Sequence, residues 1–253
     1  MSRKNWKERL YDTYFSAERH GRKLSGTTSA GTYFQQSRPF IESYIKRFFP
    51  PSRESFIVDL ACGAGAWIYY AKKMGYTRLQ GCDVSPEQVG LARKLGIAEV
   101  QQGDISSFLA NLSQPCDFIL LIDILEHLEK QELFDLLDEI YGKLAEQGKI
   151  LVHIPNAAGL GGMSVRYGDF THETAFTPSS IKQVLTAIGF SDVQCYEEQP
   201  LIRGVKGLAR NVLWRAGTLY YRLLWAAETG SLQVILSQNM TVVAAKSGVL
   251  KNT

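Results

Sequence analysis

The strongest constraint on the fold is a regular alternation of short apolar runs with helix-like segments between residue 55 and about residue 198. Several runs are continuous enough to be covered on both faces, as strands of a parallel sheet are. Two intervening segments begin with Ser85-Pro86 and Thr177-Pro178, which are helix-start signals. This rhythm predicts an α/β fold with a doubly wound, mostly parallel sheet. The expected strands are 55–60, 78–84, 97–104, 116–123, 148–156 and 192–198, and the expected helices are 66–74, 86–95, 130–145 and 178–188.

Composition narrows the class further. The chain has 253 residues, of which 45% are hydrophobic and 21% charged, so it can form one elaborated globular domain. Its net charge of +3 is too small to indicate nucleic-acid binding by bulk charge. The four cysteines lie far apart without a CxxC pair, which predicts reduced thiols rather than disulfides or a zinc site. No uncharged apolar run of about 18 residues occurs, and we expect a cytoplasmic protein.

The chain divides into three expected parts. Residues 1–54 form an N-terminal helical arm or substrate cap, with a polar stretch at 20–32 and a helix near 37–49 that stops at Pro50-Pro51. Residues 55–198 form the core. Residues 199–253 add a long basic and apolar helix at 201–229 and a last strand at 239–246, which completes the same domain.

The sequence VDLACGAG at 58–65 reads as a strand that enters a tight turn before a helix, which is where open α/β sheets bind ligands. Gly63 and Gly65 would let the backbone approach the ligand closely. A dinucleotide site would place a third glycine where Ile68 stands, and Asp59 lies in the approach to the turn. A carboxylate at that place favours a cationic or ammonium-bearing ligand over NAD.

Two more acids follow neighbouring strands. Asp83 ends the second strand, where a carboxylate can accept both hydroxyls of a ribose. Asp104 follows the third strand, where an adenine edge would pass, and Ile105 is available to cover the ring. These positions predict a nucleoside-containing ligand.

Four motifs in this order resemble the class I S-adenosylmethionine-dependent methyltransferases: VDLACGAG, the acid Asp83, GDI at 103–105 and CDFILLIDILEHL at 116–128. The resemblance covers about 55–198. It implies a Rossmann-like sheet of seven strands with the cofactor S-adenosylmethionine across its C-terminal edge. The cofactor-binding residues that it implies are Asp59, Gly63, Gly65, Asp83, Val84, Asp104, Ile105 and Asp123.

The segment 154–181 follows the fifth strand and concentrates polar side chains, and it is too glycine-rich for a stable helix. Part of it, YGDFTHETAFT, resembles a loop of methyltransferases that act on bacterial surface polysaccharides and related sugars. We expect His172 to be the general base, with Asp169 or Glu173 orienting its ring. His127 follows the fourth strand and is a second candidate near the methyl group, and no metal is expected.

These features predict an O-methyltransferase for a sugar hydroxyl of a cell-surface glycan or its lipid-linked precursor. The alternatives are a methyltransferase for quinones or secondary metabolites, with a pocket lined by the aromatic residues of the N-terminal helix, and a catalytically silent scaffold. Nucleic acid is not expected as substrate, because no Asn/Asp-Pro-Pro-aromatic motif follows the fourth strand. The segment 201–230 is expected either to pack or dimerise, or to rest its basic and aromatic face on an anionic membrane.

Overall fold

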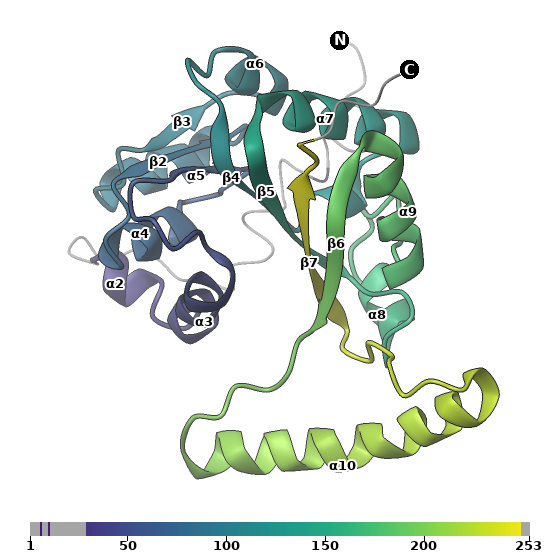
Figure 1. Ribbon diagram of the computed structural model, residues 1–253. Coiled ribbons are helices and arrows are strands. Elements are labelled where there is room, and N and C mark those ends of the chain that lie inside the picture. Colours follow the sequence, from purple (N-terminus) through teal and green to yellow (C-terminus); the bar gives the residue numbers. More distant parts are fainter. Residues whose placement is uncertain (1–5, 7–9, 11–28, 249–253) are drawn as a thin grey trace.

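The computed structural model describes residues 6, 10 and 29–248 and contains a seven-stranded sheet of order β3-β2-β1-β4-β5-β7-β6 (Figure 1). The first five strands in this order are parallel, and β7 runs antiparallel to both β5 and β6. The predicted α/β fold with a mostly parallel sheet is confirmed. The strands are β1 (Phe56–Leu60), β2 (Arg78–Asp83), β3 (Val100–Gln102), β4 (Cys116–Ile122), β5 (Leu144–Pro155), β6 (Phe190–Glu197) and β7 (Asn239–Lys246).

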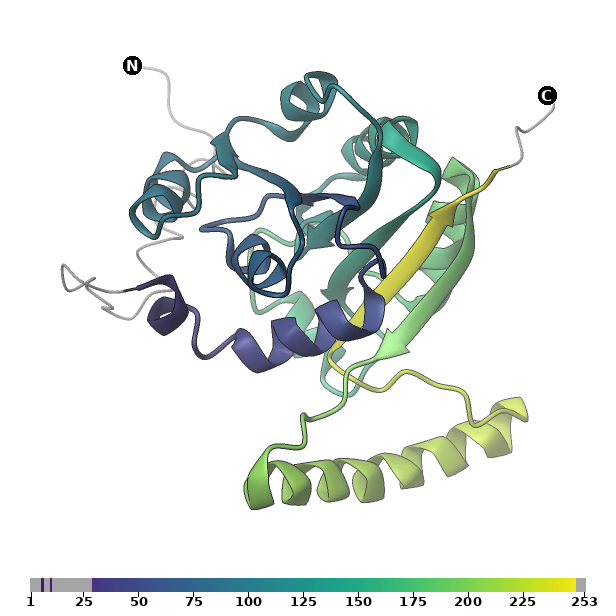
Figure 2. The same cartoon turned by 60° about the vertical axis from the view of Figure 1, so that its left-hand side comes forward.

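Helices cover both faces of the sheet (Figures 1 and 2). One buried cluster joins β1 and β4 to α6 (Ile105–Ala110), α7 (Lys130–Lys143) and α9 (Pro178–Ile188). A second cluster lies on the other face. It packs the sheet against α2 (Ala30–Tyr33), α3 (Arg38–Phe48), α4 (Ala66–Lys73) and α5 (Pro86–Lys94).

The predicted helix starts are confirmed, and their caps explain them. The Ser85 hydroxyl accepts the Gln88 N–H, and Pro86 occupies the first turn of α5. The Thr177 hydroxyl accepts the Ser180 N–H in a capping box that opens α9. Each side chain satisfies a backbone donor that has no partner within its helix.

Three local predictions were wrong. The strand expected at 97–104 is confined to Val100–Gln102, and 105–110 is helical because the Asp104 carboxylate caps it. The helix expected to reach 145 ends at Lys143, where the chain turns directly into β5. The glycine-rich segment contains a five-residue helix, α8 (Gly162–Arg166), which starts at Gly161 in the left-handed conformation. Of the polar arm expected at 20–32, residues 20–28 lie outside the described part of the chain.

The order of the strands in the sheet indicates where a ligand would bind. β1 and β4 are neighbours at the centre, and the chain reaches β4 only after it has built β2 and β3 on the other side of β1. Ligands of open α/β sheets bind outside the carboxyl ends of the strands at such a switch point. Ala61 and Asp123, which follow β1 and β4, both have φ of +53°, a conformation that residues other than glycine rarely adopt. Strained backbone at this edge is typical of functional sites.

The longest helix, α10 (Gly204–Thr229), stands away from the sheet in both views (Figures 1 and 2). Its position before β7 confirms the predicted long helix ahead of the last strand. No helix in the part of the chain that the structure describes is long and apolar enough to cross a membrane. The three-part division of the chain stays a prediction.

Candidate functional site

The turn after β1 is built around two glycines with different roles. Gly63 and Gly65 have φ of +55° and +81°, which favours glycine at both positions. A Cβ on Gly65 would lie 2.9 Å from Val100 Cγ2, so this glycine is needed for packing. A Cβ on Gly63 would meet its nearest atom, Gln88 Oε1, only at 3.7 Å. The backbone at Gly63 therefore has room beside it for a ligand.

The Asp83 carboxylate lies against this turn. Its Oδ2 accepts the Gly63 N–H and its Oδ1 accepts the Ser85 N–H, both at 2.8 Å. The end of β2 is thereby tied to the turn after β1, although 20 residues separate Asp83 from Gly63. Because each carboxylate oxygen can accept more than one hydrogen bond, acceptor sites remain for hydroxyl groups of a ligand.

Asp59 provides a test of whether a cofactor with an ammonium group fits. Its side chain is buried in β1, and neither carboxylate oxygen has a hydrogen-bond partner among the described residues. Burial, together with the charge of Asp83, raises the pKa of Asp59 well above its ordinary value. A buried carboxyl group without a partner costs free energy until a donor satisfies it. The chemistry at this end of β1 therefore fits a cationic or ammonium-bearing ligand.

The expected adenine-side residues lie at the next strand ends. Val84 is 73% exposed, which is high for an apolar side chain, and follows Asp83 directly. The Asp104 carboxylate accepts the Ser107 N–H at 2.8 Å, and this bond lowers the pKa of Asp104. Asp104 is thus the N-cap of α6, and Ile105 is the first residue of that helix.

A chain of hydrogen bonds that the sequence did not predict starts at Asp123. His153 Nδ1 lies 2.5 Å from Asp123 Oδ1, and His153 Nε2 lies 2.6 Å from Glu198 Oε1. Glu198 also accepts the Tyr44 hydroxyl at 2.7 Å. Burial lowers the pKa of His153, but the two carboxylates outweigh it and raise the pKa to about 10. His153 is thus a buried histidine with a carboxylate on each ring nitrogen, and it links Asp123 to Glu198.

The second histidine cluster joins the end of β4 to the polar loop. His127, in the short 3-10 helix η1 (Leu125–His127), and His172 have ring centroids 4.8 Å apart at 70°. His127 Nδ1 lies 2.8 Å from Thr171 Oγ1, and the Thr171 hydroxyl donates to Asp169 Oδ1 at 2.7 Å. Burial and the neighbouring His172 lower the pKa of His127.

The expectation that Asp169 or Glu173 orients His172 stays a prediction. The Asp169 carboxylate accepts the Thr171 hydroxyl, Thr171 bonds His127, and His172 Nδ1 lies 3.2 Å from the Arg166 carbonyl oxygen. Arg166 also donates to the carbonyl groups of His172 and Glu173. The loop is therefore held from within by Arg166. Because Thr171 donates to Asp169, the Nδ1 of His127 carries the proton, and its Nε2 keeps a lone pair.

Glu126 completes this cluster, and the sequence analysis did not single it out. Its side chain is 2% exposed, and Oε2 has no partner in the described chain. Burial, with a contribution from Asp123, raises the pKa of Glu126 to about 8. One ligand-type atom from each of Glu126, His127 and His172 lies within 4.8 Å of the others. Two imidazoles and a carboxylate could hold a divalent transition-metal ion.

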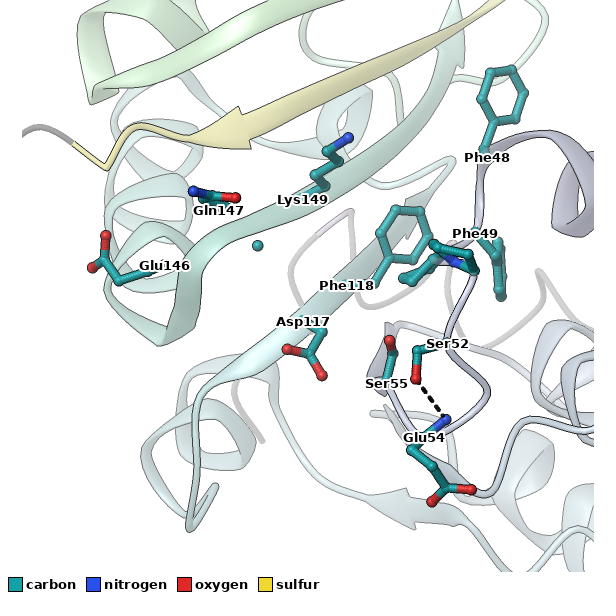
Figure 3. Close-up of a pocket in the computed structure, with 13 residues that line it drawn as sticks. Phe48, Phe49, Ser52, Glu54, Ser55, Asp117, Phe118, Glu146, Gln147 and Lys149 are labelled. Atoms are coloured by element: carbon teal, nitrogen blue, oxygen red, sulfur yellow. Dashed lines mark hydrogen bonds between the residues drawn. The ribbon is translucent and has the colours of Figure 1, made fainter.

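Two cavities flank the sheet at opposite edges. Figure 3 shows one of about 500 Å³ beside Asp117 and Lys149, where β1 and β4 begin, so it lies away from the glycine turn. The other, of about 620 Å³, lies at the carboxyl end of the sheet between α3, the end of β6 and α10. Tyr44 and Glu198, which line it, connect it to His153. Its lining also includes Phe40, Arg47, Tyr196, Asn211 and Arg215.

The fold and the turn define an α/β enzyme that binds a nucleoside-containing cofactor, and comparison with known proteins gives its class. A family model described as a methyltransferase domain matches residues 33–195. A search of curated proteins found no match. A solved S-adenosylmethionine-dependent methyltransferase from Archaeoglobus fulgidus is 21% identical, with a TM-score of 0.62, and the match covers 85% of this chain and 97% of that one.

Two further solved structures are similar. A Thermotoga maritima protein described as a possible histamine N-methyltransferase is 15% identical, with a TM-score of 0.58, and 95% of this chain and 97% of that chain are covered. The phosphoethanolamine N-methyltransferase 2 of Haemonchus contortus, solved with S-adenosylmethionine, is 17% identical, with a TM-score of 0.57, and the match covers 88% and 54% of the two chains.

The chain belongs to the methyltransferase domain family. It is a class I S-adenosylmethionine-dependent methyltransferase, and S-adenosylmethionine is its cofactor. The expected enzyme class and cofactor are confirmed.

Proposed function

We propose that the enzyme transfers the methyl group to a hydroxyl of a sugar in a cell-surface glycan or its lipid-linked precursor. The observation that carries this proposal is the pair His127 and His172, which lies between the end of β4 and the polar loop. An alcohol is a weak nucleophile that gains from a general base, and imidazole is well suited to that role. A methyl group on a sulfonium is transferred in line, so the residues must also align the acceptor.

For the cofactor, we propose that the turn and the strand ends hold its parts separately. Gly63 and Gly65 lie beside the methionine part, and Asp59 interacts with its ammonium group. Asp83 accepts the ribose hydroxyls through its remaining lone pairs. Val84, Asp104 and Ile105 flank the adenine, and the open side of Val84 suits an aromatic ring. Asp123 borders the cofactor from β4, in an orientation fixed by His153.

For the acceptor, we propose that His172 is the general base. Its Nδ1 faces the Arg166 carbonyl, so a proton on Nδ1 leaves the Nε2 lone pair to take the hydroxyl proton. His127 contacts cofactor or substrate from the other side, and Asp169 acts on it through Thr171. The proposed step requires no metal ion.

We propose that the cavity of about 620 Å³ at the carboxyl edge holds a part of the acceptor away from the methylated hydroxyl, because neither His127 nor His172 lines it. Its lining combines aromatic rings, such as Phe40 and Tyr196, with Glu198 and two arginines. Aromatic faces and charged hydrogen-bonding groups suit a sugar that carries an acidic substituent. Trp6 also reaches the loop, since its ring packs edge to face on Phe170, which agrees with a substrate cap.

A small-molecule acceptor is the second candidate. Similar solved structures are described as a possible histamine N-methyltransferase and as a phosphoethanolamine N-methyltransferase. A pocket of about 620 Å³ could also hold such a molecule.

Methyl-labelled S-adenosylmethionine separates the candidates. The protein is incubated in parallel with a lipid-linked glycan extract, a quinone precursor and phosphoethanolamine. We expect label in the glycan fraction only, and label in either small molecule instead would overturn the sugar assignment.

A further inference from the structure

The helix α10 presents one face to the protein and the opposite face outward. It has 26 residues, and its buried residues are Gly207, Asn211 and Thr218, which recur at steps of four and seven and so share one side. Asn211 Nδ2 donates to the Pro200 carbonyl from this side. The fully buried positions of this side are therefore small or polar, and the half-buried Trp214 and Arg222 lie on the same side.

The outward face is apolar along its whole length. Val205 is 85% exposed and Leu213 is 71% exposed, values that are unusual for aliphatic side chains in a folded protein. Helical spacing places them opposite the inward residues. The members of this outward apolar face, all at least half exposed, are Val205, Leu208, Val212, Leu213, Leu219, Tyr220, Leu223 and Leu224.

The charges of α10 are almost all positive. The helix carries Lys206, Arg210, Arg215 and Arg222 against a single acid, Glu228. Arg222 is engaged with the protein, because its Nη2 donates to both carboxylate oxygens of Glu197 at 2.7 Å. Arg222 thereby anchors the helix to the end of β6. Arg215 also faces the protein, since it lines the cavity beside Asn211 and its Nη2 lies 3.5 Å from Gln199 Oε1. Lys206 and Arg210 remain to flank the apolar face.

We infer that α10 lies in the plane of an anionic lipid bilayer, with the outward apolar face at the boundary of the acyl chains and its cations among the headgroups. A strongly apolar face, basic flanks and an exposed aromatic residue such as Tyr220 are typical of helices that bind in this way. Charge argues against a second copy as the occupant, because two such helices would bring like charges together. An anionic surface neutralises them instead.

With α10 on the bilayer, the cavity of about 620 Å³ would lie next to the membrane surface. Asn211 and Arg215 of α10 line the same cavity as Tyr44 and Glu198. A glycan attached to a lipid in that bilayer would therefore reach the cavity from the membrane side. This last step rests on the proposed function, whereas membrane binding by α10 does not.

Vesicle sedimentation with the full chain tests the inference. Neutral phosphatidylcholine vesicles are compared with vesicles that also contain phosphatidylglycerol, at low and high salt. We expect binding to the anionic vesicles that weakens as salt rises. The double variant Leu213→Glu/Leu223→Glu should lower partitioning by more than about tenfold. Lys206→Gln/Arg210→Gln should lower it by a similar factor on anionic vesicles only.

Met163→Glu is the matched control, because Met163 in α8 is 61% exposed and lies outside α10. It should bind vesicles as the wild type does, and cofactor affinity verifies that each variant is folded. Absence of sedimentation with anionic vesicles at low salt would overturn the inference. Dimerisation in solution that the Leu213→Glu/Leu223→Glu variant abolishes, without vesicle binding, would also overturn it and assign the face to a second copy. Because no acceptor is present, the result does not depend on which group is methylated.

Discussion

The imidazole rings of His127 and His172 meet edge to face, with centroids 4.8 Å apart, although 45 residues separate them in the chain. One ring belongs to the segment that follows β4 and the other to the polar loop that follows β5. Since β4 and β5 are adjacent and parallel, their carboxyl ends bring the two segments together. We propose that the acceptor hydroxyl is held beside these rings, where an imidazole can accept its proton.

Replacement of the proposed base should separate chemistry from binding. His172→Asn should lower turnover about 10²–10⁴-fold, because the acceptor proton then has no base, while cofactor affinity stays nearly unchanged. Single-turnover rates and calorimetry measure the two effects. If turnover barely falls, His172 is not the base, and the same measurement on His127→Asn tests the neighbouring ring.

Asp83 and Asp117 form a matched pair for cofactor binding. Asp83 accepts the Gly63 N–H at the carboxyl edge of the sheet, and Asp117 accepts the Phe56 N–H at 2.7 Å at the amino edge. Asp83→Ala should weaken cofactor affinity by at least about tenfold, because charged hydrogen bonds to ribose are lost. Asp117→Ala removes a similar backbone contact and should leave this affinity unchanged. Equal affinities for the two folded variants would contradict the assignment.

The two glycines of the turn should respond differently to a methyl group. Gly65→Ala brings a Cβ to 2.9 Å from Val100 Cγ2 in a left-handed backbone, so the free energy of unfolding should fall by about 2–4 kcal/mol. Gly63→Ala has space and should cost only about 1–2 kcal/mol of backbone strain. Its main effect should be on cofactor affinity. Urea denaturation measures the free energy of unfolding, and calorimetry measures cofactor affinity. Normal cofactor affinity of Gly63→Ala would contradict this account.

The sequence predicts the parts of this site that are local. Continuous apolar runs and the Ser85-Pro86 and Thr177-Pro178 signals gave the strands and helix starts, because a few neighbouring residues determine them. Pairings between distant residues carry no local signal. The bonds of His153 to Asp123 and Glu198, and the approach of Glu126 to two histidines, arise only when adjacent strands align. The outward apolar face of α10 could be found as periodicity, but not the direction in which it points.

The ion pairs of His153 should stabilise the fold less as the pH rises into the alkaline range. Its pKa is raised to about 10 in the folded protein, against about 6.5 in an unfolded chain. The contribution is therefore fully present below about pH 6.5 and is lost as the pH rises toward 10. The free energy of unfolding of the wild type and of His153→Gln is measured with urea at pH 6 and at pH 10. The variant should be less stable than the wild type at pH 6, and this loss of stability should be smaller at pH 10. A difference that is the same at both values would contradict the charged state of His153.

Metal removal tests whether a histidine lone pair or an ion activates the acceptor. With His172 as base, dialysis against EDTA should leave turnover unchanged. Loss of activity that Zn²⁺ or Mn²⁺ restores would contradict the base mechanism. It would instead make Glu126, His127 and His172 ligands of that ion.

The identity of the acceptor atom that receives the methyl group tests the central claim most directly. The protein is incubated with S-adenosylmethionine carrying a ¹³C-labelled methyl group and with lipid-linked glycan, and the product is examined by NMR. The account predicts a labelled methyl bonded to a sugar oxygen, which the His172→Asn variant produces about 10²–10⁴-fold more slowly. A label on nitrogen or carbon, or no label in the glycan while a small amine or quinone is methylated, would contradict it.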